Sequence, residues 1–334
     1  MSIESPTSSH PYDALKPDVI LDAVESLGYR CDSRLQAMNS YENRVFQVGI
    51  EDGGSVVVKF YRPGRWSDAA IREEHDFTLE LAAHELPVLA PLPGQDDRTL
   101  HDMQNFRFAV YQTQGGRPPE LDQPEDLAQL GRCLARLHNV GELHAFQARQ
   151  SLNIQTHGYQ ARDAVLASGL LPDDVRASYE AIADHLLSGI ESAYERAGHL
   201  PLLRLHGDCH PGNILLRDGT LWLLDFDDCC SGPAMQDLWL FLSGDRPFMT
   251  ARLQELLEGY TEFRQFDPRQ LHLVEALRAM RLLHHAAWLA RRWDDPAFPQ
   301  AFPYFNSRRY WDDYILNLRE QAGQLDEPPL EWFP

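Results

Sequence analysis

The sequence predicts an α+β protein with two lobes, a small lobe rich in β-strand and a larger helical lobe. Three observations lead to this expectation. Short alternating or valine-rich segments with turn signals occupy the first third of the chain. Glycine and proline pairs at 115–116 and 118–119 then predict a short linker. Apolar residues at helical spacing dominate the remainder, and ligand sites tend to lie where two such lobes meet.

The first third combines helical and strand patterns. Apolar residues recur at helical spacing across 20–27, and Gly28 follows as a stop signal. Three segments have the pattern of strands, and an Asp-Gly-Gly turn separates the first two: residues 41–48, 55–61 and 107–111. Between the second and the third, Ser67 is a candidate N-cap for a helix that runs to about His84.

From about Pro124 onward, helical periods dominate. A leucine stripe across 127–137 and a leucine and methionine stripe across 273–287 are interpreted as helix faces in the core. Two short apolar runs lie between them, at 202–205 and 221–224, and each ends in a polar cluster. These two polar clusters hold the residues with the most informative chemistry.

Composition and charge exclude several classes of function. The chain has 334 residues, with 50 acidic and 30 basic side chains and a net charge of −20. Such a field repels nucleic-acid phosphates and anionic membrane surfaces. No apolar run is long enough to span a membrane, and the polar residues 1–11 do not resemble a secretory signal. We therefore expect a cytoplasmic protein with no nucleic-acid or membrane partner.

The cysteines also indicate a reducing compartment. There are five, an odd number, and no C-x-x-C pair occurs, so neither a disulfide framework nor a structural zinc site is expected. The adjacent Cys229 and Cys230 are interpreted as small buried residues.

The most informative segment is His-Gly-Asp-Cys-His-Pro-Gly-Asn at 206–213. It contains Asp208 and Asn213 in a D-x-x-x-x-N pattern, and Asp225 follows the apolar run at 221–224. Phosphoryl transfer needs a carboxylate that accepts the proton of the attacking hydroxyl, with oxygen ligands for Mg²⁺ nearby. The pattern therefore indicates a phosphoryl-transfer site.

The same segment allows a second interpretation. His206, Asp208 and His210 could be the transition-metal ligands of a metallohydrolase, since histidine and carboxylate ligands suit zinc or iron. The Gly-Asn ending and the later Asp-Phe-Asp favour magnesium and phosphoryl transfer instead. In that case His206 braces the loop through hydrogen bonds to local backbone.

A lysine interrupts the valine-rich strand at 55–61. Burying an unpaired ammonium is costly, so Lys59 either faces water at a sheet edge or binds nucleotide phosphates while a helix carboxylate holds it. The following helix offers Glu73 and Glu74, and its phase places Glu74 on the apolar arc and Glu73 at the edge. Glu74 is the preferred partner, and Glu73 remains an alternative.

No glycine-rich phosphate loop and no Walker A sequence occurs in the chain. The polar turn at 39–44 can still offer backbone N–H groups and the Ser40 hydroxyl to a phosphate. Taken alone, this segment has the pattern of an ordinary hairpin turn.

Together, the strand lysine, the helix glutamate, the H-G-D-x-H-x-G-N segment and the Asp-Phe-Asp resemble one branch of the protein kinase superfamily, the aminoglycoside phosphotransferase/choline kinase branch. Longer segments resemble the bacterial stress-response kinases within it: residues 39–44, 57–63, 205–215, 232–239 and 275–299. The resemblance implies a two-lobed protein-kinase-like fold. Residues 1–113 would form the nucleotide-binding N-lobe, and residues 114–334 the helical C-lobe with the catalytic loop and metal site.

The resemblance also implies ATP, Mg²⁺ and transfer of phosphate to Ser or Thr of proteins, with autophosphorylation and a monomeric state as further expectations. Asp208 would be the proton acceptor. Asn213 and Asp225 would hold magnesium, and Asp225 would also count as catalytic. Lys59 and Ser40 would contact ATP.

Glu74 would then pair with that lysine, and Asp237 would brace the catalytic loop. Two positions depart from the eukaryotic kinase pattern, since Gly207 replaces an arginine and Asp227 replaces the glycine of D-F-G. The stretch that ends at Asp237 is too short for a long activation segment, so regulation by phosphorylation there is not expected. With so short a stretch, the sequence also does not indicate which surface would bind a peptide substrate.

The sequence leaves two alternatives to a protein kinase. One is a kinase for a small hydroxylated metabolite or antibiotic, of the aminoglycoside, choline or homoserine type. The other is a pseudokinase that binds nucleotide and a partner without turnover, and the intact set of lysine, asparagine and aspartates disfavours it.

Overall fold

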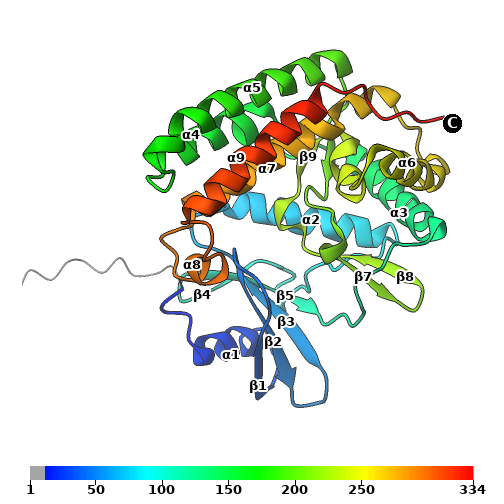
Figure 1. The fold of residues 1–334 in the computed structure, drawn as a ribbon. Coiled ribbons are helices and arrows are strands. Elements are labelled where there is room, and N and C mark those ends of the chain that lie inside the picture. Colours follow the sequence, from blue (N-terminus) through cyan, green and yellow to red (C-terminus); the bar gives the residue numbers. More distant parts are fainter. Residues whose placement is uncertain (1–11, 334) are drawn as a thin grey trace, which may run out of the picture.

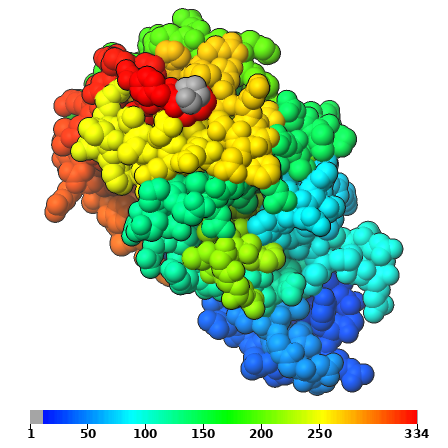
Figure 2. All heavy atoms as spheres, turned by 90° about the vertical axis from the view of Figure 1, so that its right-hand side faces the viewer, coloured from blue at the N-terminus to red at the C-terminus, as the bar shows by residue number. Residues whose placement is uncertain are grey.

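The computed structural model describes residues 12–333. The polar start of the chain at 1–11, interpreted above as a lead-in without a secretory signal, lies outside the described residues. Figure 1 shows a twisted sheet at one end of the molecule and a body of helices at the other. In Figure 2 the blue and cyan residues of the sheet region form a narrower end below the broader helical body. The predicted α+β fold, β-rich first and helical afterwards, is confirmed.

A five-stranded antiparallel sheet, with the order β1-β2-β3-β5-β4, forms the centre of the N-terminal region. The strands are β1 Cys31–Ala37, β2 Arg44–Ile50, β3 Ser55–Phe60, β4 His101–Met103 and β5 Phe106–Gln112. β2, β3 and β5 match the predicted strands. The sequence pattern does not predict β1 and β4, because β1 is a mostly polar, exposed edge strand and β4 has only 3 residues.

β3 presents different side chains to the two faces of the sheet. Alternate residues from Val56 to Phe60 pack into a core that α1 (Pro17–Glu25) covers. Because side chains alternate along a strand, Lys59 points to the opposite face, where α2 (Asp68–Ala83) lies. Figure 1 shows α2 between the sheet and the helical body.

Two helix boundaries follow the predicted signals. The Ser67 hydroxyl accepts the N–H of Ala70 at 3.2 Å and so caps α2. α1 ends shortly before Gly28, which has a φ of +93° that favours glycine.

The C-terminal region is a helical body around one large apolar core. Its helices are α3 Pro124–Leu143, α4 Gln160–Ala167, α5 Asp173–Ala197, α6 Arg246–Thr261, α7 Val274–Arg291, α8 Ala297–Ala301 and α9 Arg308–Leu325. The predicted leucine and methionine stripes lie on α3 and α7, and both are buried. Within residues 12–333, no helix combines the length and the hydropathy that a membrane span requires.

Four short strands fix the two polar loops of the helical body. β6 (Leu203–Leu205) pairs with β9 (Cys230–Gly232), and β7 (Ile214–Arg217) pairs with β8 (Thr220–Leu223). The loop from β6 to β7 and the loop from β8 to β9 therefore begin and end at paired strands. This pairing brings the two predicted polar clusters together.

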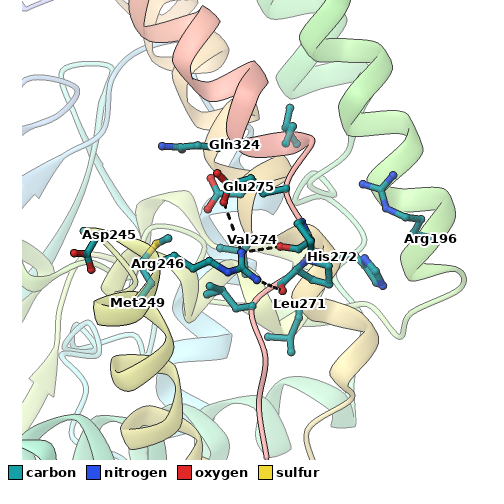
Figure 3. A pocket seen from close by; sticks show the side chains of 15 residues that line it. Arg196, Asp245, Arg246, Met249, Leu271, His272, Val274, Glu275 and Gln324 are labelled. Atoms are coloured by element: carbon teal, nitrogen blue, oxygen red, sulfur yellow. Dashed lines mark hydrogen bonds and ion pairs between the residues drawn. The ribbon is translucent and has the colours of Figure 1, made fainter.

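The C-terminal end of the chain is fastened to the start of α6. Arg246 donates hydrogen bonds to the carbonyl oxygens of Pro328 (2.8 Å) and Pro329 (2.6 Å) and pairs with Glu327 at 3.7 Å. Figure 3 shows this contact beside a cavity of about 170 Å³, whose lining includes none of the residues of the two polar loops.

Candidate active site

The loop from β6 to β7 and the residue after β8 form one cluster. The backbone N–H of Leu224 donates to the Asn213 carbonyl at 2.9 Å, which places Asp225 directly beside Asn213 in the fold. The Asn213 side-chain amide donates to the Asp208 carbonyl oxygen at 3.0 Å, so its own Oδ1 stays available as a ligand. Asp225 has a φ of +54° and a side chain that is 57% exposed. Two side-chain oxygen donors of the kind that can hold a hard metal ion thus lie on adjoining backbone segments.

Asp237 holds the start of this loop in place through hydrogen bonds to its backbone. Its carboxylate is fully buried and accepts the backbone N–H groups of His206 and Gly207, both at 2.9 Å. The ring of His138 lies 3.2 Å from the same carboxylate. A buried carboxylate with three such partners fixes the position of the backbone that carries Asp208.

His206 uses both ring nitrogens on local backbone. Nε2 donates to the Leu224 carbonyl at 2.7 Å, and Nδ1 accepts the N–H of Asp208 at 3.3 Å. This is the bracing role expected for His206, and it removes the first ligand of the metallohydrolase interpretation. Nowhere in the described chain do three or more histidine, cysteine, aspartate or glutamate side chains lie where they could hold a metal ion together.

Gly207 is required by the close approach of the two loops. Its φ is +86°, and a Cβ atom at this position would lie 2.1 Å from the carbonyl oxygen of Asp228. An arginine, which eukaryotic kinases have here, would not fit this backbone.

Lys59 is buried and lies among three carboxylates. Its Nζ is 3.2 Å from Glu74 Oε1, 3.3 Å from Asp225 Oδ1 and 3.0 Å from Asp227 Oδ1. Burial acts to lower the pKa of Lys59, but Asp227, Glu74 and Asp225 outweigh it and raise the pKa well above its ordinary value. The ammonium is therefore charged at neutral pH and is fixed where β3, α2 and the Asp-Phe-Asp segment meet.

The two glutamates of α2 have separate partners. Glu74 pairs with Lys59, and its second oxygen accepts Arg149 Nη2 at 2.7 Å. Glu73 instead accepts the backbone N–H groups of the loop after α3: Gln147 at 2.6 Å, Ala148 at 2.9 Å and Arg149 at 2.8 Å. Of the two glutamates left open by the sequence, Glu74 is thus the one that contacts the lysine.

Sequence reasoning missed the roles of three residues in this network, Asp227, Arg65 and Arg149. In the sequence pattern Asp227 is only a departure from D-F-G, yet in the fold it is buried between Lys59 and Arg65, which both pair with it. Arg149 donates to Glu74 and, at 2.5 Å, to the Asp227 carbonyl. The second aspartate of the Asp-Phe-Asp segment is the sequence feature that could have identified Asp227. No local pattern marks Arg149.

Asp208 faces a cavity of about 430 Å³ between the two lobes. Arg281 of α7 donates to its Oδ1 at 2.5 Å, and His210 Nε2 lies 3.5 Å from its Oδ2. Burial acts to raise the pKa of Asp208, but His210 and Arg281 outweigh it and hold the pKa well below its ordinary value. Asp208 is therefore ionised at neutral pH, and the space before it can receive an acceptor molecule.

Ser40 lies outside this network. It is half-buried in the turn between β1 and β2 and forms no hydrogen bond with the other described residues. Its neighbour Glu42 lines the cavity and is held by Trp288 Nε1 at 2.8 Å and Arg292 Nη2 at 2.6 Å. These contacts fasten the turn to α7, so that the Ser40 segment is positioned from the C-terminal region.

A β-rich lobe with a buried lysine, joined to a helical lobe with an Asp-Asn loop and a second aspartate, defines a kinase-like phosphotransferase. The chain belongs to the phosphotransferase enzyme family, because the sequence model of that family matches residues 34–274. It is 42% identical to stress response kinase A of Escherichia coli strain K12 across 98% of both chains. The expected resemblance to the bacterial stress-response kinases is thereby confirmed.

Two further comparisons agree with this assignment. The chain is 42% identical to a protein of Salmonella typhimurium strain LT2 named serine/threonine protein kinase RdoA, across 97% of both chains. Among solved structures, amicoumacin kinase hAmiN, in complex with AMP-PNP and Ca²⁺, has a TM-score of 0.72. It covers 95% of this chain and 96% of its own at 19% identity, which shows a shared fold.

Proposed function

We propose that this phosphotransferase is an ATP- and Mg²⁺-dependent serine/threonine protein kinase of the bacterial stress response that acts in the cytoplasm as a monomer. The observation that carries the proposal is the identity of 42% across nearly the whole chain to relatives named stress response kinase A and serine/threonine protein kinase RdoA. Residues 1–113 would bind the nucleotide, and residues 114–334 would provide the catalytic loop and the metal ligands.

The residues in the cluster suit nucleotide and metal. Lys59 is a charged ammonium between the two regions, as a phosphate-binding lysine requires, and the Ser40 turn is the proposed second contact to ATP. The Asn213 side-chain oxygen and the exposed Asp225 carboxylate are the hard ligands that Mg²⁺ prefers. When bound, Mg²⁺ would neutralise charge on the phosphate oxygens.

The proposed reaction uses Asp208 as proton acceptor. The acceptor hydroxyl donates a hydrogen bond to the Asp208 carboxylate, which Asp237 and His206 hold in place through the loop backbone. The hydroxyl oxygen forms a bond to the γ-phosphorus of ATP while the bond from that phosphorus to the β–γ bridging oxygen breaks. The hydroxyl proton passes to Asp208, and ADP leaves with the bridging oxygen.

One observation favours a small-molecule acceptor as the second candidate. The cavity before Asp208 measures about 430 Å³, which lies within the range of sites for small ligands, roughly 300–1,000 Å³. Aromatic residues Tyr41, Trp288 and Phe302 line it. A metabolite or antibiotic with a hydroxyl group would fit a cavity of this kind.

Incubation with γ-labelled ATP decides between the two. The acceptors are a generic basic protein, the enzyme itself, two aminoglycosides, choline and homoserine, and Asp208→Asn serves as the matched inactive control. We expect label on Ser or Thr, located by mass spectrometry, in the wild type only. Label confined to a small alcohol, with every protein unmodified, would replace the proposal by the second candidate.

A further inference from the structure

Arginine side chains offset much of the acidic charge in the acceptor cavity, although the chain as a whole is strongly acidic. The net charge of −20 by itself favours cationic acceptors. Three carboxylates line the cavity, but each of them pairs with an arginine, and two of these arginines belong to the lining themselves. Glu42 pairs with Arg292, Asp228 with Arg65 and Asp208 with Arg281. Each carboxylate on this wall therefore already has a guanidinium partner, which weakens its attraction for an ammonium group of an acceptor.

Of the two arginines that line the cavity, only Arg281 is open to an incoming ligand. The Arg65 side chain is 14% exposed and lies among Glu42, Asp227 and Asp228. The Arg281 side chain is 43% exposed, and its sole hydrogen bond among residues 12–333 goes to Asp208. Four of the five N–H donors of its guanidinium are thus available to a ligand.

The position of Arg281 ties it to the acceptor and not only to the fold. It extends from the cavity face of α7, one turn before His285, and contacts Oδ1, one of the two carboxylate oxygens of Asp208, the proposed proton acceptor. An acceptor hydroxyl that approaches Asp208 therefore comes within reach of the guanidinium. A cationic group beside that hydroxyl would be repelled, and an anionic group would be paired.

We propose that Arg281 is a specificity-determining residue that binds an anionic group next to the acceptor hydroxyl. The inference rests on the proposed function in taking that hydroxyl to be a Ser or Thr side chain. It predicts that the enzyme prefers a serine flanked by carboxylates to one flanked by lysines, and that it disfavours polycations such as aminoglycosides.

Equilibrium binding tests this preference without requiring turnover. Three fluorescent peptides differ only in the residues on either side of one serine, which are Asp, Gln or Lys, and are titrated with AMP-PNP and Mg²⁺ present. At about 0.15 M salt, where distant surface charges are screened, we expect the Asp peptide to bind the wild type about tenfold more tightly than the Lys peptide. Arg281→Gln should bring the ratio close to one, and Arg281→Glu should invert it.

Arg309→Gln is the matched control, because Arg309 is 92% exposed on α9 and lies outside the cavity. It should keep the wild-type ratio, and thermal unfolding checks that all variants are folded. A wild-type preference for the Lys peptide, or a ratio that Arg281→Glu leaves unchanged, overturns the proposal. Equal loss of affinity for all three peptides also overturns it, since Arg281 would then act on the nucleotide or the fold.

Turnover of the same peptides separates this inference from the proposed function. If the wild type phosphorylates none of them and labels only a small alcohol, the protein-kinase proposal fails. Arg281 is then tested by the ratio of kcat/KM for two small alcohols of equal size, one with a carboxylate and one with an ammonium group. A ratio that Arg281→Glu inverts supports the role of Arg281, and a ratio that it leaves unchanged rejects it.

Discussion

Lys59 Nζ lies 3.2 Å from Glu74 Oε1, and both side chains are buried where the sheet meets α2. The neighbouring Glu73 has no contact with the lysine and instead caps the N–H groups at 147–149. Adjacent residues of identical chemistry thus have different roles, because successive side chains on a helix point about 100° apart.

This difference gives a first prediction. Glu74→Gln should lower kcat/KM by about 10²-fold, because a displaced Lys59 would no longer meet the ATP phosphates that it is proposed to bind. Lys59→Ala should have an effect at least as large. Glu73→Gln is the matched control. It should lower the melting temperature and leave the turnover number close to that of the wild type. Steady-state kinetics that give equal losses for the two glutamate variants would contradict the assignment.

The second prediction concerns the proton acceptor. Asp208→Asn keeps the shape of the side chain but cannot take up the hydroxyl proton, so turnover should fall roughly 10²–10⁴-fold. The affinity for AMP-PNP should stay within about threefold of the wild type, because the nucleotide makes its main contacts elsewhere. Rapid phosphoryl transfer by this variant would show that another group is the base.

The third prediction concerns the metal. The proposed ligands are oxygens of Asn213 and Asp225, so chelator-treated enzyme should regain activity with Mg²⁺ or Mn²⁺ and not with Zn²⁺. Asn213→Ala and Asp225→Asn should raise the Mg²⁺ concentration needed for half-maximal activity. Elemental analysis offers an independent check. Stoichiometric zinc in the purified protein, lost on His210→Ala, would restore the metallohydrolase interpretation.

Sequence patterns within single strands and helices predicted part of the candidate site. The alternation of β3 and the phase of α2 were enough to bring Lys59 and Glu74 together. Arg149 could not be found in this way, because it meets Glu74 across 75 residues of chain and lies in a loop with no periodic pattern. The contact of Arg281 with Asp208 spans 73 residues.

The edge strand β1 was missed for a different reason. Its polar, exposed residues lack the apolar alternation that marks a half-buried strand, and only pairing with β2 makes it a strand. The short β4 likewise depends on its partner, β5. Pairing of this kind is a property of the tertiary fold and has no counterpart in the sequence pattern.

The fourth prediction tests the close approach of the two polar loops of the helical body. Gly207→Ala places a Cβ 2.1 Å from the Asp228 carbonyl oxygen at a positive φ. It should lower the free energy of unfolding by about 3 kcal/mol or more and abolish activity. Gly219→Ala is the control, because Gly219 has a φ of +77° and no atom within 4 Å of the added Cβ. It should cost only about 1 kcal/mol. If urea unfolding gives the same loss of unfolding free energy for both variants, the loops can move apart at little energetic cost.

The last prediction concerns the contact that fastens the β1–β2 turn to α7. Glu42 is 11% exposed and accepts hydrogen bonds from Trp288 and Arg292. Burial acts to raise the pKa of Glu42, but the hydrogen bond from Arg292 and the charge of Arg65 outweigh it and hold the pKa below its ordinary value.

A lowered carboxylate pKa in the folded state stabilises the protein at any pH above the unfolded value, about 4.3 for glutamate. The stabilisation is lost as the pH falls through the folded pKa. Glu42→Gln should therefore lower the free energy of unfolding by about 3 kcal/mol at pH 7 and flatten its decline below about pH 5. It should also raise the KM for ATP, because the Ser40 turn is no longer held against α7.

Glu142→Gln is the matched control for this experiment. Glu142 pairs with Arg264 at 2.7 Å, but its side chain is 56% exposed, and exposed ion pairs contribute less than about 1 kcal/mol. Urea unfolding at a series of pH values, together with KM for ATP, measures both expectations. If Glu42→Gln keeps the pH dependence and the KM of the wild type, the turn is positioned by other contacts, such as the packing of Tyr41 on Phe302 at 5.1 Å.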